Sequence, residues 1–221
     1  MRLQLAIDTL RLDEAEALVA RVRDLVDVVE VGTPLVIREG VGAVRRLRAA
    51  FPGLVLLADL KIADGGYLEA TLGLEAGARI VTVLAAAADA TIREVVRAAR
   101  ERGGEAMVDL LGVEDLARRA REVDALGVDL VCLHTAVDVQ AGTADLAGAA
   151  LQGLLQVKAA LRNARTAVAG GITLERCADL AALGPDVVVV GSAITRAADP
   201  RAAAAAVRAA LRGAGGGGRA P

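Results

Sequence analysis

Residues 55–66, VLLADLKIADGG, carry the pattern that predicts both the fold and the site. An apolar run of strand length ends there in two carboxylates that flank an ammonium group. Because side chains alternate along a strand, Asp59 and Lys61 share one face of it. Asp64 follows the expected strand end, where two glycines allow a positive φ that would turn a third charge toward the same place. The stretch predicts an Asp-Lys-Asp polar centre, and the alternative is a strand end whose charges are simply hydrated.

Short apolar runs alternate with longer amphipathic segments along the whole chain, which is typical of repeated βα units around a parallel sheet. Eight such units can be counted. The expected strands are residues 3–7, 26–31, 54–60, 79–84, 105–110, 129–133, 166–169 and 186–190. The expected helices are residues 12–24, 36–50, 68–76, 90–102, 113–126, 146–163, 174–183 and 200–212.

Eight units with nearly continuous apolar strands favour a closed α/β fold, the (β/α)8 TIM barrel. An open doubly wound sheet is the main alternative. Such a sheet would place a G-x-G-x-x-G motif after an early strand, and none follows the first or second strand here. We expect a single barrel domain over residues 1–212 and a flexible, Gly-rich tail over residues 213–221.

The charge and the cysteine content of the chain indicate which binding partners and which compartment to expect. With 26 basic and 28 acidic residues the formal charge is −2, which gives no basic field for nucleic acid or an anionic membrane. Two cysteines are too few for a disulfide framework and fit a reducing compartment. The sequence shows no leader pattern and no apolar stretch long enough to span a bilayer. We therefore expect a cytoplasmic protein that binds neither nucleic acid nor membrane.

Polar residues collect at the expected ends of the strands, which is where barrels of this kind build their active sites. The scattered residues can therefore be treated as one spatial set, too polar to be a packing layer. They are Asp8, Glu30, Thr33, Asp59, Lys61, Asp64, Asp109, His134, Thr135, Asp138 and Gln140.

Glu30 stands inside the apolar run Val28-Val29-Glu30-Val31, where an ionised carboxylate is costly unless it is paired or bound to a metal. With Asp59 on the neighbouring strand, it could hold a hard divalent cation such as Mg²⁺. This ion usually takes a few carboxylates and completes its shell with waters and substrate oxygens. The alternative is a Glu30–Lys61 ion pair without a metal.

The remaining strand ends indicate a proton carrier and a phosphate site. His134, the only histidine, follows an apolar strand, and imidazole titrates near neutral pH, which suits proton transfer. Glycine turns follow the seventh and eighth strands, at Gly170-Gly171 and at Gly191-Ser192. Such turns with a helix start behind them form the phosphate cradle of many barrels, although either one alone can simply close a loop.

The sequence resembles the orotidine-monophosphate-decarboxylase suprafamily, and within it the 3-hexulose-6-phosphate synthase family. The resemblance runs from about residue 3 to residue 210, and its most specific part is the D-x-K-x-x-D signature. The motifs that carry it are LQLAID (3–8), EVGTP (30–34), ADLKIADG (58–65), DALGVD (124–129), HT (134–135), AGGI (169–172) and VG (190–191).

The resemblance implies a homodimer with shared active sites, in which Asp64 serves the partner subunit's site. It also implies Mg²⁺, with Mn²⁺ able to substitute, and an aldol addition of formaldehyde to the sugar phosphate D-ribulose 5-phosphate through an enediolate. Glu30 and Asp59 would hold the metal, Lys61 would balance the developing charge, and His134 would transfer protons. Asp8 and Asp64 would orient sugar hydroxyls.

Two other functions remain open. The related 3-keto-L-gulonate-6-phosphate decarboxylases carry an arginine three residues after the active-site histidine, and Val137 occupies that position here. The resemblance therefore favours the synthase. Ser192-Ala193 replaces a glycine pair that the synthases often have, so the phosphate turn differs in detail. A sugar-phosphate sensor without catalysis is the other alternative, and the retained charged set argues against it.

Overall fold

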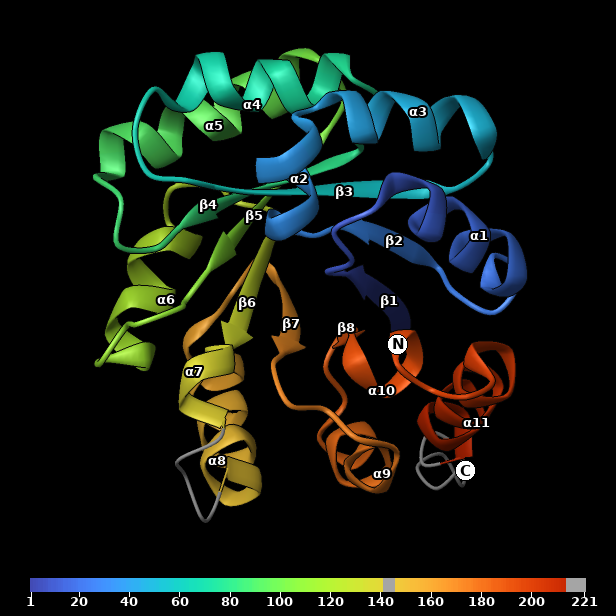
Figure 1. Cartoon of the computed structure of the whole chain (residues 1–221). Coiled ribbons are helices and arrows are strands. Elements are labelled where there is room, and N and C mark those ends of the chain that lie inside the picture. The colour runs from blue at the N-terminus through green and yellow to red at the C-terminus, as the bar shows by residue number, and fades with distance from the viewer. Residues whose placement is uncertain (141–145, 214–221) are drawn as a thin grey trace, which may run out of the picture.

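The computed structural model describes residues 1–140 and 146–213, which form a closed barrel of eight parallel strands (Figure 1). The strands follow one another in chain order, and β8 pairs with β1 to close the barrel. The predicted (β/α)8 barrel is therefore confirmed. Apart from Gly213, the predicted tail lies outside the described residues. The strands are β1 (Arg2–Ile7), β2 (Val28–Val31), β3 (Val55–Ile62), β4 (Ile80–Leu84), β5 (Glu105–Asp109), β6 (Leu130–His134), β7 (Arg165–Ala169) and β8 (Val187–Val190).

Helices lie around the outside of the barrel (Figure 1). The single helix predicted for residues 36–50 is wrong, because the segment is divided into α2 and α3. Gly40 separates them with a φ of 63°, which glycine adopts without the strain of an L side chain. In residues 1–140 and 146–213 no helix is both long and apolar enough to cross a membrane. The helices are α1 (Leu12–Val22), α2 (Thr33–Glu39), α3 (Gly42–Ala50), α4 (Gly66–Glu75), α5 (Asp89–Glu101), α6 (Leu116–Asp124), α7 (Val137–Gln140), α8 (Leu146–Ala160), α9 (Leu174–Leu183), α10 (Ser192–Thr195) and α11 (Pro200–Gly213).

The alternation of side chains along the strands separates the barrel interior from an outer core under the helices. The outer core contains residues such as Leu56, Ala58 and Ile62 of β3. The interior is filled by a second, smaller apolar cluster. Its buried members are Val28, Leu57, Ile80, Met107, Leu130, Cys132, Ala167, Ala169, Val187 and Val189.

Aspartates at the opposite, N-terminal end of the barrel tie neighbouring strands together. Asp27, Asp129 and Asp186 each immediately precede an even-numbered strand. Each accepts a hydrogen bond from a backbone N–H of the preceding odd-numbered strand, at 2.8 to 2.9 Å. These bonds satisfy donors at the strand starts that would otherwise be left without partners. The charges at this end therefore serve stability, whereas those at the C-terminal end form the site described below.

Asp27 also binds α11, and this gives a test of its contribution to stability. Its carboxylate accepts from Leu3 N at 2.8 Å and from two Arg208 nitrogens at 2.8 and 3.1 Å. Burial alone would raise the pKa of Asp27, but these bonds outweigh it and lower the pKa. We expect Asp27→Ala to reduce the free energy of unfolding at pH 7 by about 1–3 kcal/mol, measured by urea denaturation.

The contribution of Asp27 to the free energy of unfolding should also depend on pH. A carboxyl whose pKa is lowered by folding contributes stability above its unfolded pKa, and this contribution is lost as the pH falls through the folded value. The difference between Asp27→Ala and the wild type should therefore shrink below about pH 4. Asp179→Ala, at an exposed position on α9, is the control and should change stability by less than about 0.5 kcal/mol. A pH-independent difference would contradict this account.

Candidate active site

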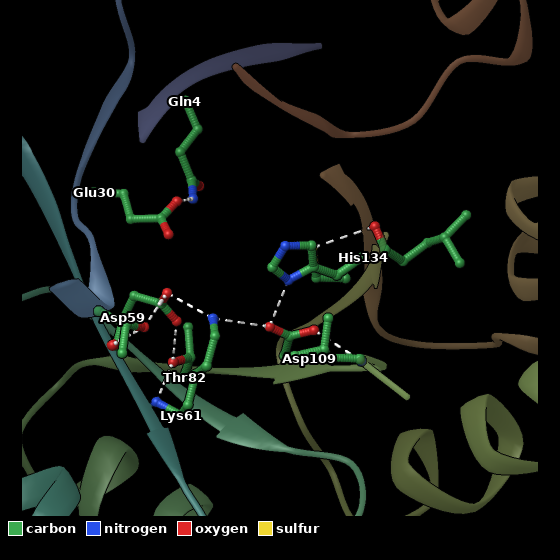
Figure 2. A network of polar contacts seen from close by, with 11 residues as sticks. Gln4, Glu30, Asp59, Lys61, Thr82, Asp109 and His134 are labelled. Atoms are coloured by element: carbon green, nitrogen blue, oxygen red, sulfur yellow. Dashed lines mark hydrogen bonds and ion pairs between the residues drawn. The ribbon is translucent and has the colours of Figure 1, made fainter. Parts of the chain in front are cut away.

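Lys61 is at the centre of a polar network at the C-terminal ends of the strands (Figure 2). Its ammonium Nζ lies 2.7 Å from Asp59 Oδ2 and 3.3 Å from Asp109 Oδ2. Burial on its own would lower the pKa of Lys61, but the two carboxylates outweigh it and raise the pKa above its ordinary value. The ammonium is therefore fixed as a cation between two anions on β3 and β5.

The backbone of β3 explains how both charged side chains reach the interior. Asp59 and Lys61 do share one face, as predicted from the alternation. The register with β4 shifts between Ala58 and Ile62, and Lys61 has a φ of 47°, which is uncommon for a residue other than glycine. The hydroxyl of Thr82 on β4 bridges the irregular part of β3. It accepts from Lys61 N at 2.9 Å and donates to Asp59 Oδ1 at 2.8 Å.

Asp59 is held by three side chains on different elements. Its Oδ2 accepts from the Thr33 hydroxyl and from Lys61 Nζ, both at 2.7 Å, and its Oδ1 accepts from Thr82. The residue is 5% exposed. A buried carboxylate with several donors in fixed positions has little freedom to turn, so its orientation is preset before any ligand arrives.

Asp109 connects Lys61 with His134. Its Oδ2 lies 2.8 Å from His134 Nδ1, and its Oδ1 accepts from Leu111 N at 2.9 Å. Burial alone would raise the pKa of Asp109, but the bond and charge of His134, together with Lys61, lower it. An ionised Asp109 can only accept, so Nδ1 carries the hydrogen in this contact, and Nε2 takes no part in it.

Glu30 of β2 forms a separate pair with Gln4 of β1. Gln4 Nε2 donates to Glu30 Oε2 at 2.6 Å (Figure 2). The predicted alternative of a Glu30–Lys61 ion pair is wrong, because the ammonium is engaged by Asp59 and Asp109. Burial, followed by the charge of Asp59, raises the pKa of Glu30 to about 8. Without a cation beside it, this carboxyl therefore tends to keep its proton.

Asp64 does not belong to the network within one chain, which corrects the expected Asp-Lys-Asp centre. The third member of that centre is Asp109 instead. Asp64 is exposed beyond the end of β3, and its Oδ1 accepts from the N–H of Gly65 at 2.7 Å. Gly65 has a φ of 60°. The glycine turn that was expected to bring Asp64 inward thus holds its carboxylate against its own backbone.

Asp8 and the glycine turns lie at the ends of β1, β7 and β8. Gly191 lies beside Asp8, because an added Cβ there would be in van der Waals contact with Asp8 Oδ2, at 3.7 Å. Burial, followed by the charge of Asp59, raises the pKa of Asp8. Gly170 and Gly171 have φ values of 94° and 64°, and a side chain at Gly170 would overlap the carbonyl of Thr135. Behind Gly191, α10 begins at Ser192.

A small cavity of about 20 Å³ opens at the centre of this arrangement. Its walls combine the charged network with the apolar interior of the barrel. No group of three or more His, Cys, Asp or Glu side chains that could by itself hold a metal occurs in residues 1–140 and 146–213. The lining residues are Gln4, Glu30, Asp59, Lys61, Thr82, Met107, Asp109, Cys132, His134, Ala169 and Val189.

Three members of the site had no role assigned to them from the sequence. Thr82, Thr33 and Gln4 hold the charged side chains, yet none was assigned a role, and Asp109 was placed at a strand end without a partner. Thr82 is the single polar residue of β4, and Gln4 stands between the apolar residues Leu3 and Leu5 of β1. That signal was present in the sequence and is the same one that identified Glu30.

Comparison with known proteins finds relatives that match almost the whole chain. Residues 1–207 match the family described as Orotidine 5'-phosphate decarboxylase / HUMPS family. A 3-hexulose-6-phosphate synthase of Bacillus subtilis is 46% identical over 199 residues, which cover 90% of this chain and 93% of that protein. The crystal structure of 3-hexulose-6-phosphate synthase from Salmonella typhimurium superposes with a TM-score of 0.91 at 45% identity, covering 97% of this chain and 100% of that one.

A third relative was solved with a ligand. The crystal structure of KGPDC from Streptococcus mutans in complex with a sugar phosphate has a TM-score of 0.89 at 26% identity, over 97% of this chain and 99% of that chain. Sequence and structure therefore agree along almost the whole barrel, and the chain belongs to the orotidine 5'-phosphate decarboxylase / HUMPS family.

Proposed function

We propose that this protein acts as a 3-hexulose-6-phosphate synthase, an aldehyde-lyase of the ribulose monophosphate pathway. It would add formaldehyde to D-ribulose 5-phosphate and give D-arabino-hex-3-ulose 6-phosphate. The observation that carries the proposal is the fixed Lys61 ammonium between Asp59 and Asp109, with His134 beside it, in a chain 46% identical to a protein of that name. Relatives of this name imply an enzyme that acts on a carbon–carbon bond.

Glu30 and Asp59 are the residues that would hold Mg²⁺, or Mn²⁺ in its place. The donor set fits a hard cation, because both groups are carboxylates and Mg²⁺ normally takes only one or two of them beside waters and substrate oxygens. A buried, unpartnered amide oxygen of Gln4 adds a further polar atom to the same cavity. When bound, the cation would lower the energy of the negative charge that develops on the sugar oxygens.

The side chains of the chain itself would carry the protons and the charge. His134 Nε2 would take a proton from C1 of the ketose, leaving an enediolate whose negative oxygen faces the Lys61 ammonium. C1 would then form the new bond to the formaldehyde carbon, and the former aldehyde oxygen would take up a proton to become a hydroxyl. Asp109 would keep the imidazole oriented throughout, because it holds Nδ1.

The other proposed contacts are with the rest of the sugar phosphate. Gly170, Gly171, Gly191 and Ser192 would bind the phosphate through backbone N–H groups at the turns after β7 and β8. Asp8 would bind sugar hydroxyls. The sugar phosphate named as the ligand of the KGPDC complex supports this class of substrate.

A homodimer with shared sites would give Asp64 a role that it lacks within one chain. Apolar side chains are exposed on the helices that follow β2 and β3: Ile37 is 80% exposed, and Leu68 is 66% exposed. Burying such side chains against a second copy would be favourable. We also propose a cytoplasmic location, which suits the two buried free cysteines, Cys132 and Cys177.

The proposed reaction predicts that purified protein consumes formaldehyde only when ribulose 5-phosphate and Mg²⁺ are both present. Removing the metal with EDTA should abolish consumption, and added Mg²⁺ should restore it. Lys61→Met should lower kcat by at least about 100-fold, because an apolar group then faces the developing oxyanion. A control without ribulose 5-phosphate corrects for the reaction of formaldehyde with surface amines. Faster release of CO₂ from 3-keto-L-gulonate 6-phosphate, by kcat/KM, would instead favour the decarboxylase.

Shared active sites predict complementation between two inactive variants. A Lys61→Met chain and an Asp64→Asn chain, mixed and allowed to exchange subunits, form some dimers in which one site has both native residues. Random exchange should restore about a quarter of the wild-type activity. The same mixture without exchange is the control. Activity that stays at the level of the separate variants would exclude the proposed role of Asp64.

Thr82 should be needed for the geometry of the site although it carries no charge. Thr82→Val keeps the shape but removes the bonds to Asp59 Oδ1 and Lys61 N, so kcat should fall by about 10- to 100-fold. The matched variant Thr82→Ser keeps the hydroxyl and should retain most of the activity. Equal activity of the two variants would show that the hydroxyl does not position Asp59 and Lys61.

A further inference from the structure

Gln4 is a buried amide in a place where the barrel otherwise packs apolar side chains. It lies on β1 between Leu3 and Leu5, which face the outer core, so its own side chain points into the interior. It is 1% exposed. An amide removed from water costs free energy unless its polar atoms find partners, whereas a leucine at this position would not carry that cost. The interior thus contains a polar group that packing alone does not require.

One half of this amide has a partner and the other half does not. Gln4 Nε2 donates to Glu30 Oε2 at 2.6 Å. Gln4 Oε1 is buried without a hydrogen-bond partner among the described residues. Gln4 also lines the cavity of about 20 Å³, which is large enough for one water molecule. The amide therefore has two connections to the site. Its Nε2 donates to Glu30, and its side chain forms part of the cavity wall.

The contact fixes which oxygen of Glu30 remains available. Oε2 is turned toward Gln4, and the other carboxylate oxygen is on the side of Asp59 (Figure 2). When both carboxyl groups are ionised, as cation binding requires, they repel, so an ionised Glu30 would otherwise gain by rotating away from Asp59. A neutral N–H donor behind Glu30 opposes that rotation without bringing a competing cation into the cavity.

We propose that Gln4 is a positioning residue for a divalent cation at Glu30 and Asp59, holding the Glu30 carboxylate in the orientation that binds the ion. This inference rests on the metal site of the proposed function, but not on the identity of the reaction. Residues that orient metal ligands usually contribute a factor of about 10 to 100 in metal affinity.

The test is a calorimetric titration of the metal-free full-length protein with Mn²⁺ alone, without sugar phosphate or formaldehyde. Gln4→Leu should weaken Mn²⁺ binding by about 10- to 100-fold. Thr166→Val is the matched control, because Thr166 is also a buried strand residue, and its hydroxyl bonds to Asp186 at the other end of the barrel. It should bind Mn²⁺ like the wild type. Binding by Gln4→Leu within about twofold of the wild type would overturn the inference.

A double-mutant cycle separates positioning from general damage. In a Glu30→Asp background the shorter side chain loses the contact with Gln4, so Gln4→Leu should then change Mn²⁺ affinity by less than about twofold. Equal effects in both backgrounds would mean that Gln4 acts by another route, and the inference would fail. Gln4→Met, a flexible side chain of similar length, is the second variant if Gln4→Leu does not fold.

The outcomes also distinguish this inference from the proposed reaction. Mn²⁺ binding that depends on Gln4, in a protein that does not consume formaldehyde, would support the positioning role and contradict the synthase. Formaldehyde consumption by the wild type, together with unchanged Mn²⁺ affinity in Gln4→Leu, would support the synthase and contradict the positioning role. A wild-type protein that binds no Mn²⁺ would overturn the inference together with the proposed metal.

Discussion

The structure of the site depends on one constraint, the pairing of the Lys61 ammonium with Asp59 and Asp109 inside the mouth of the barrel. A buried charge is tolerated only when opposite charges and hydrogen bonds surround it. The closed barrel meets this condition because β3 and β5 both present side chains to the same interior, although 48 residues separate Lys61 from Asp109. The neighbouring side chains hold the two aspartates in place. Thr33 and Thr82 donate hydrogen bonds to Asp59, and His134 Nδ1 lies in hydrogen-bond contact with Asp109.

The two ends of the barrel use aspartate for different purposes. At the N-terminal end, Asp27, Asp129 and Asp186 accept backbone N–H groups and join adjacent strands. At the C-terminal end, Asp59 and Asp109 contact the Lys61 ammonium directly, and Asp109 also contacts His134. The backbone of Lys61, at a φ of 47°, is also less relaxed there. Strain and buried charge concentrate at functional sites because the rest of the fold is stable enough to hold them.

The sequence predicts the architecture well because the same pattern of strand and helix occurs eight times. An error in the bounds of one unit does not change the predicted number of units or the fold. The position of Asp59 and Lys61 on one face could also be predicted from alternation within one strand, whereas the irregular backbone at Lys61 could not. That Asp109 and not Asp64 is the third member of the charged centre could not be predicted. This depends on the turn at Gly65 and on the register of the strands across β4. The same holds for Gln4 and Thr82, whose partners lie on other strands.

Two carboxyl groups of the site are driven in opposite directions by their surroundings. Burial would raise the pKa of Asp109, but His134 and Lys61 outweigh it and lower the pKa, so this group stays ionised and accepts the Nδ1 hydrogen of the imidazole. Glu30 has only a neutral amide as donor, and its pKa is raised to about 8. The charge of Lys61 lowers the pKa of Glu30, but burial and the charge of Asp59 outweigh it. The metal proposed at Glu30 would supply an opposite charge that the neutral amide of Gln4, its hydrogen-bond partner, does not.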